Sequence, residues 1–360
     1  MKKQTLKSLV YTGLIFILSG FTALTTAIDK DKTFNVSKGD NLEVGVSNGN
    51  ITISTWEKDQ VYIKAVDIED DDLKYLKIEQ QGNRVIVEFK GEDSDDFYLE
   101  ISIPSQFNLD LASGGGNIRI KDNINGKVEL ATGGGNIKVN DVTDELSIAT
   151  GGGNISVGSV SGETELSTGG GNIDVKDVKN KIDISTGGGN ISIGNIGGNA
   201  EVSTAGGNIS VGKVSGSAEL NTAGGNINLD GAIGKVEVNT AGGNISLKNI
   251  SGSVDANTAG GNIYAELIPS GNSNNEFNTA GGNISLLLPS DAKADIVATV
   301  HVGKHKSESE MDDLIKSDFQ PVSVNFDKST RNLTKKFILN GGGSKIDLNT
   351  AGGKIKINKK

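Results

Sequence analysis

A six-residue motif, Thr-(Gly/Ala)-Gly-Gly-Asn-Ile, recurs along the middle of this 360-residue chain and constrains its fold more than any other feature. Successive motif asparagines are separated by 19 residues once, by 18 residues seven times and by 21 residues once. These asparagines are Asn117, Asn136, Asn154, Asn172, Asn190, Asn208, Asn226, Asn244, Asn262 and Asn283. A fixed period of this length is typical of proteins in which each repeat forms one unit of a stack. The sequence therefore predicts a repeat architecture over residues 111–286.

Each repeat contains two pairs of apolar residues, such as Ile227 with Leu229 and Val236 with Val238. The members of a pair are two residues apart, so each repeat predicts two short strands that face one interior. Such a unit is either a hairpin of an antiparallel meander or one coil of a parallel stack. The Gly-Gly-Asn segment between the strands is expected to form a corner, because glycine and asparagine tolerate positive φ.

Polar residues recur as regularly as apolar ones, and this favours the coil. Stacked coils place identical side chains about 4.8 Å apart, so asparagines and threonines can form hydrogen bonds along a ladder. The threonines of this predicted structural ladder are Thr132, Thr150, Thr168, Thr186, Thr204, Thr222, Thr240, Thr258 and Thr279. We therefore predict an all-β fold, a parallel β-solenoid of about ten 18-residue coils.

The segments on either side of the repeats predict three further regions. Residues 1–27 resemble a secretory signal peptide, with Lys2 and Lys3 before an apolar run and small residues at a plausible cleavage site. Residues 28–110 alternate apolar and polar side chains and predict an acidic antiparallel β module that caps the stack. Residues 287–360 predict irregular strands at 294–302, 322–326 and 333–339, then a terminal coil in which Lys354 replaces the asparagine and ends the stacking.

The composition narrows the possible partners. The net charge of −10 argues against nucleic acid and anionic membrane surfaces as ligands. Cysteine is absent, which excludes disulfides and thiolate metal sites. After removal of the signal segment, no apolar run is long enough to span a bilayer. No cofactor is implied by any motif.

Taken together, the signal segment, the acidic β module, the tandem repeats and the Leu-Pro-Ser-Asp-Ala segment at 288–292 resemble a family of exported bacterial proteins called putative adhesins with β-strand repeats. The resemblance covers most of the mature chain. It implies a β-solenoid, a secreted or cell-envelope location and an adhesive role, and it supplies no catalytic residues.

One set of residues is a candidate for binding. An acidic residue precedes most of the ladder threonines by three positions: Glu129, Glu165, Asp183, Glu201, Glu219, Glu237, Asp255 and Glu276. Like charges stacked along a sheet are unfavourable, so neighbouring lysines or a bound cation should offset them. Lys127, Lys181 and Lys235, each two residues before an acidic member, are the expected partners. The column is then either a solvated face that prevents aggregation or a stripe that binds cations or a cationic partner.

Other chemistries have weaker support. The glycine corners lack the aspartate of calcium-binding rolls, and His301 and His305 have no evident third metal ligand, so no metal site is predicted. We predict an exported non-enzymatic solenoid, in the periplasm, cell envelope or medium, which serves as an adhesin or scaffold for an unknown cell-surface or glycan ligand. The alternative is a carbohydrate-active parallel β-helix, a lyase or hydrolase, but the regular repeats show no local departure where paired carboxylates could form a catalytic site.

Overall fold

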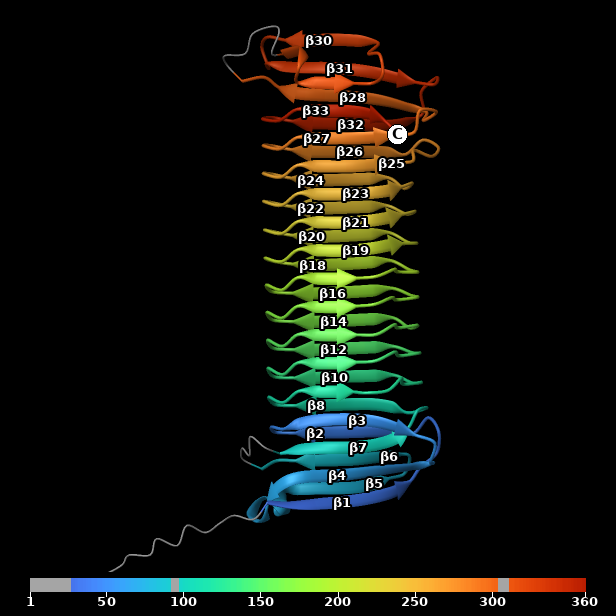
Figure 1. Ribbon diagram of the computed structural model, residues 1–360, viewed down its shortest axis with the longest axis vertical. Helices are drawn as coiled ribbons and strands as arrows, with labels where there is room; N and C mark the ends of the chain where they lie inside the picture. Colours follow the sequence, from blue (N-terminus) through green and yellow to red (C-terminus); the bar gives the residue numbers. More distant parts are fainter. Residues whose placement is uncertain (1–26, 92–96, 304–310) are drawn as a thin grey trace, which may run out of the picture.

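The computed structural model describes residues 27–91, 97–303 and 311–360 and shows a long rod of stacked strands (Figure 1). The predicted signal peptide, apart from Ala27, lies outside the described residues, as does His305. The rod consists of two sheets that face each other, with the apolar core between them. A 3-10 helix, η1 (Asp70–Tyr75), lies near the N-terminal end.

The first sheet, called sheet A, contains strands in this order: β1 (Ala27–Asn35), β4 (Gln60–Glu69), β7 (Tyr98–Pro104), β3 (Asn50–Trp56), β9 (Ile118–Ile120), β11 (Ile137–Val139), β13 (Ile155–Val157), β15 (Ile173–Val175), β17 (Ile191–Ile193), β19 (Ile209–Val214), β21 (Ile227–Ala232), β23 (Ile245–Ile250), β25 (Ile263–Leu267), β27 (Ile284–Leu288), β33 (Ile355–Lys359) and β29 (Ile315–Ser317).

The second sheet, called sheet B, contains β5 (Leu76–Gln81), β6 (Arg84–Phe89), β2 (Asn41–Val46), β8 (Asn108–Ser113), β10 (Val128–Thr132), β12 (Leu146–Thr150), β14 (Thr164–Thr168), β16 (Ile182–Thr186), β18 (Ala200–Thr204), β20 (Ala218–Thr222), β22 (Val236–Thr240), β24 (Val254–Thr258), β26 (Asn274–Thr279), β32 (Ser344–Thr350), β28 (Ala294–His301), β31 (Asn332–Leu339) and β30 (Ser323–Asp327).

Neighbouring repeats pair in parallel and in register, as a coil requires and a hairpin does not. In sheet B, β20 pairs with β22 so that Leu220 lies opposite Val238 and Thr222 opposite Thr240. In sheet A, β21 pairs with β23 in the same way. The apolar residue of each pair points between the sheets because alternate residues of a strand face opposite sides. The predicted parallel β-solenoid is therefore confirmed.

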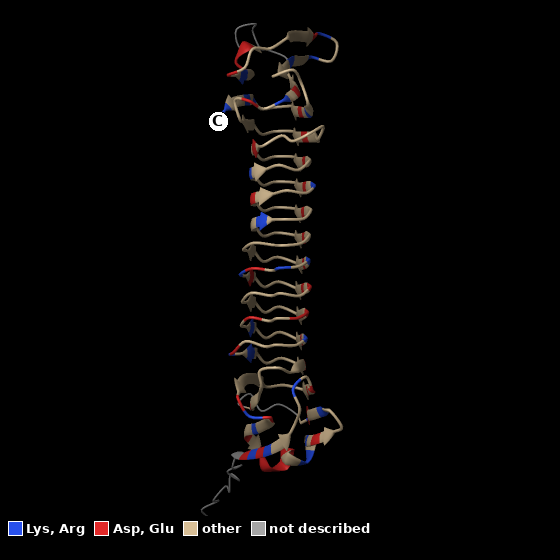
Figure 2. Ribbon diagram, turned by 90° about the vertical axis from the view of Figure 1, so that its right-hand side faces the viewer, with Lys and Arg blue, Asp and Glu red and all other residues tan. Residues whose placement is uncertain are grey.

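The N-terminal region differs from the antiparallel cap that the sequence predicts. The pairings β1–β4, β4–β7 and β5–β6 are antiparallel, but β2 pairs in parallel with β6 and β8, and β3 pairs in parallel with β7 and β9. Strands β2 and β3 thus form a coil of the stack. Alternation of apolar and polar residues shows which side chains are buried but not the direction of neighbouring strands. The prediction of antiparallel pairing throughout this region is therefore wrong for β2 and β3. Figure 2 shows charged residues of both signs gathered at this end of the rod.

The last coil is also placed differently from the prediction. Strand β32 lies between β26 and β28, and β33 lies between β27 and β29. The coil that carries Lys354 is therefore inside the stack, and β28, β31 and β30 form the end of sheet B. The three irregular strands predicted before it are confirmed as β28, β30 and β31. The misplaced coil shows that the last residues of a chain need not form the last layer of its fold.

The corner glycines have a different purpose from the one expected. Among the described residues, glycines with positive φ lie outside the recurring corners, for example at Gly49 and Gly271. The third glycine of each corner is required by close approach instead. A Cβ atom on Gly225 would lie 1.9 Å from the carbonyl oxygen of Gly207, in the coil beneath it. The tight stacking of corners, and not turn conformation, selects glycine there.

Candidate functional site

The threonine column lies inside the solenoid and bonds to the backbone. Thr222 is 5% exposed, and its Oγ1 donates a hydrogen bond to the carbonyl oxygen of Gly207 at 2.9 Å. The Oγ1 of Thr222 also accepts a hydrogen bond from the backbone N–H of Gly225 at 3.2 Å. Equivalent bonds recur from Thr132 to Thr350. Each hydroxyl therefore joins two coils through the glycine backbone, and not through the neighbouring threonine as the sequence suggested.

The corner asparagines are exposed and form a chain of amide contacts. The Oδ1 atom of Asn226 accepts hydrogen bonds from the backbone N–H and the Nδ2 of Asn244, at 2.8 and 3.1 Å. This pattern runs from Asn50, through the ten motif asparagines, to the backbone N–H of Lys354. These side chains satisfy backbone donors at the corner that have no strand partner. The geometry assigns them to the architecture.

The acidic column follows the outer face of sheet B. Glu219 lies opposite Glu201 on one side and Glu237 on the other, and this register continues from Glu129 to Glu276 with Ser147 as an interruption. The structure extends the column to Glu43 and Asp110 at one end, and at the other end it places Asp347, which precedes Thr350 by three residues in the last repeat, opposite Glu276. All eight predicted members are exposed or half-buried.

The lysine partners are only partly those expected. Lys235 Nζ lies 2.9 Å from Glu237 Oε2, and this hydrogen bond raises the pKa of Lys235. Lys127 instead contacts Glu145 of the next coil at 2.6 Å, so its predicted pairing with Glu129 is wrong. A lysine side chain is long enough to reach the adjacent coil, and its own strand therefore does not determine its partner.

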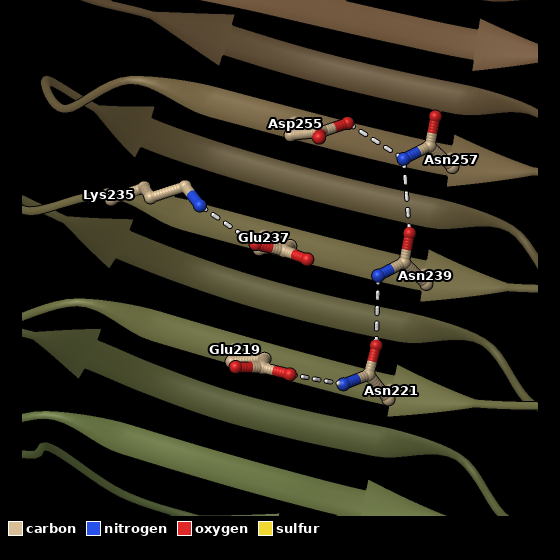
Figure 3. Close-up of polar contacts among 7 residues, drawn as sticks. All are labelled: Glu219, Asn221, Lys235, Glu237, Asn239, Asp255 and Asn257. Carbon is tan, nitrogen blue, oxygen red and sulfur yellow. Dashed lines mark hydrogen bonds and ion pairs between the residues drawn. The ribbon is translucent and has the colours of Figure 1, made fainter.

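A second amide column, two residues after the acidic one, was not recognised from the sequence as a unit. Asn239 Nδ2 donates to Asn221 Oδ1 at 3.0 Å, and Asn257 Nδ2 donates to Asn239 Oδ1 at 3.1 Å (Figure 3). The chain continues through Asn278 to Asn349. The recurrence of an acidic residue, any residue, asparagine and threonine in these coils was the signal that could have revealed it.

The amide column also holds carboxylates in place. Asn221 Nδ2 donates to Glu219 at 3.1 Å, and Asn257 Nδ2 donates to Asp255 at 2.7 Å. Figure 3 shows the alternation: Glu219 and Asp255 point toward asparagines, whereas Glu237 points toward Lys235. Each of these amide oxygens accepts one hydrogen bond within the column, and its second lone pair and the carboxylate oxygens can accept from a ligand that carries hydroxyl or amino groups.

Beside this column runs a shallow groove of about 870 Å³, floored by corner threonines and alanines from Thr204 to Ala351. His301 and Asn332 line its end, with His301 Nδ1 and Asn332 Oδ1 3.2 Å apart. His301 lies on β28, as the strand pattern indicated. The described residues contain no group of three or more His, Cys, Asp and Glu side chains arranged to hold a metal ion.

Two stacked sheets of in-register parallel strands define this protein as a β-solenoid. The chain belongs to the Toastrack DUF4097 family, whose model matches residues 39–203 and again residues 176–358. The two matches overlap and together include the repeats and both flanking regions. This confirms the sequence-based assignment to a family of repeat-containing β proteins.

Solved structures of similar proteins include a putative adhesin from Parabacteroides merdae ATCC 43184, 14% identical, with a TM-score of 0.35 over 72% of this chain and 95% of that one. A putative adhesin from Parabacteroides distasonis ATCC 8503 is 14% identical, with a TM-score of 0.37 over 73% and 98%. A putative lipid binding protein from the same strain is 13% identical, with a TM-score of 0.26 over 92% and 96%. None of the curated proteins matches this chain. Within the described residues, no helix has the length and hydropathy needed to cross a membrane.

Proposed function

We propose that this protein is an exported, non-enzymatic adhesin or envelope scaffold that binds an extended cell-surface or glycan ligand along sheet B. The observation that carries the proposal is the in-register outer face of sheet B, where the acidic column runs along nearly all of the coils and the amide column and its groove run along those from β20 to β32. A rigid rod with repeated acceptor groups presents many equivalent contacts, and multivalent contact converts weak individual binding into strong attachment.

Several features support a binding role over a catalytic one. The acidic column repeats aspartate or glutamate in nearly all of the coils, whereas a catalytic centre needs a few groups placed at unequal positions. The names of the similar solved proteins, putative adhesins and a putative lipid binding protein, describe binding. The predicted signal segment supports export, and the periplasm, the cell envelope and the medium are all compatible locations.

The proposal is tested with the mature protein on a glycan array and on whole bacterial cells, together with a screen for polysaccharide cleavage with and without calcium. We expect binding without release of products. A triple variant, N221S/N239S/N257S, should bind less tightly, since serine occupies this column in other coils and preserves the strand. A control variant on the opposite sheet, S192A/S210A, should bind normally. Product release that one carboxylate-to-amide change abolishes would instead establish an enzyme.

A further inference from the structure

On the outer face of sheet A, one repeat position carries an aromatic side chain where the other described coils have a polar or charged residue. The residue that follows the motif isoleucine points outward, and in most coils it is small and polar, as at Ser210, Ser246 and Ser285. In β25 this position is Tyr264, whose side chain is 36% exposed. A large aromatic group on an otherwise flat polar face offers an apolar surface with a polar hydroxyl at its edge.

The inserted terminal coil brings cations to this tyrosine. Strand β33 pairs with β27, so Lys356 lies opposite Ser285, and Ser285 lies opposite Tyr264. Two strand spacings separate Tyr264 from Lys356, roughly 9–10 Å. Lys354 occupies the corner position above Asn283 and, like Lys356, is exposed. Tyr264, Lys354 and Lys356, with the adjacent serines and asparagines, line a groove of about 580 Å³, which we call the tyrosine–lysine groove.

The charges of this groove are incompletely compensated by the protein. Lys356 lies directly opposite Lys316 of β29, and like charges in this position are unfavourable. The Lys316 ammonium is compensated by Asp313 at 2.9 Å. Within the described residues, neither Lys354 nor Lys356 forms an ion pair, although Asp313 is close enough to Lys354 for the two charges to attract each other. A basic group in a chain of net charge −10 is a local exception, and an anion bound there would remove the repulsion.

We propose that the tyrosine–lysine groove binds an acidic sugar unit of a polysaccharide, an inference that rests on the proposed role in glycan binding. The Tyr264 ring packs against the carbon–hydrogen face of a pyranose ring. Lys354 and Lys356 bind the anionic substituent, and the amides of Asn262 and Asn283 and the hydroxyl of Ser285 lie within the same groove for the sugar hydroxyls.

Two observations favour a saccharide over other anionic partners. The cations lie beside an aromatic ring, and a small inorganic anion would gain nothing from contact with that ring, whereas a sugar ring can pack against it. The acidic columns of sheet B repel extended polyanions such as nucleic acids and anionic membrane surfaces, whereas a single acidic sugar unit is small enough to contact sheet A alone.

The test measures binding of the mature protein to a hexameric oligogalacturonate by calorimetry, with neutral maltohexaose and a sulfated oligosaccharide as comparisons. The variant Y264S places the residue of neighbouring coils at this position and should raise the Kd by about fivefold. The double variant K354Q/K356Q should raise it by about tenfold. The control variant K138Q removes an exposed lysine from the same face of β11 and should leave the Kd unchanged.

Each outcome decides the matter. Tight binding of both the uronate and the sulfated probe, lost in K354Q/K356Q, supports a site for acidic sugars that accepts either a carboxylate or a sulfate group. Preference for one probe identifies which of these groups the site binds. Equal losses in K138Q and K354Q/K356Q would show only general charge attraction and would overturn the inference, as would equal binding to phosphatidylglycerol vesicles or to DNA. Unaltered binding by Y264S would also overturn it. Binding of other glycans without uronate or sulfate binding refutes this inference and leaves the proposed function standing; absence of all glycan and cell binding refutes both.

Discussion

The threonine column and the acidic column lie on the same strands, three residues apart, and recur with the same period, yet their surroundings are opposite. Thr222 is buried and its hydroxyl makes two hydrogen bonds to glycine backbone. Glu219, on the other side of the strand, is exposed and contacts Asn221. A lost hydrogen bond costs more when the remaining polar group is buried than when water replaces the partner. Recurrence in the sequence therefore shows that a residue belongs to a column of the stack, whereas its burial determines how much it contributes to folding stability.

The largest loss of stability is expected at the corner glycine that follows the buried threonine by three residues. Replacement of Gly225 by alanine places a Cβ atom 1.9 Å from the Gly207 carbonyl oxygen, and we expect the free energy of unfolding to fall by at least about 3 kcal/mol. Gly224→Ala is the matched control, because its Cβ would lie 3.6 Å from the nearest atom, and it should change stability by no more than about 1 kcal/mol. Urea unfolding measures both. Equal losses in the two variants would show that close stacking is not the reason for glycine.

A smaller loss is expected when the buried hydroxyl itself is removed. Thr222→Val keeps the side-chain shape but leaves the Gly207 carbonyl and the Gly225 N–H without their partner, and we expect a loss of about 1–3 kcal/mol. Thr222→Ser retains the hydroxyl and should lose clearly less. A valine variant as stable as the parent protein would remove the distinction between the two columns.

The exposed acidic column should contribute far less to stability than the buried threonines, and its contribution should depend on pH. Because Glu237 raises the pKa of Lys235, the contribution of this pair to stability is present below the ordinary lysine pKa and is lost as the pH rises through the higher value of the folded state. Glu237→Gln should return the Lys235 pKa toward its ordinary value, as followed by NMR of the ammonium group. The unfolding midpoint at neutral pH should remain within experimental scatter. An unchanged Lys235 pKa would mean that the ion pair does not persist in solution.

The smallest effect is expected from calcium. The acidic column is partly compensated by Lys235 and by the amides of Asn221 and Asn257, and the described residues form no metal-binding group. Millimolar calcium should therefore leave the melting temperature unchanged. A clear upward shift, lost in Glu201→Gln, would make the column a cation-binding stripe.

Much of the repeat region was predictable because its signals are local. The spacing of Ile227, Leu229, Val236 and Val238 identified two strands per repeat and their buried faces. The site was less predictable. The acidic residues were found, but the contact between Lys127 and Glu145 and the amide chain through Asn239 depend on how adjacent coils place long or polar side chains.

The sequence by itself determined that this chain forms a parallel stack, because its asparagines and threonines recur with the same 18-residue period as its apolar pairs, and identical polar side chains can form a ladder only when coils lie on one another in register. Only the tertiary structure decided the order of the coils at the two ends. Both β2 with β3 and β32 with β33 insert between strands that are distant in sequence. Local periodicity is the same for an inner and an outer coil, so the choice depends on pairings that close long loops. That choice places Lys356 near Tyr264, and the candidate sugar-binding groove exists only because of it.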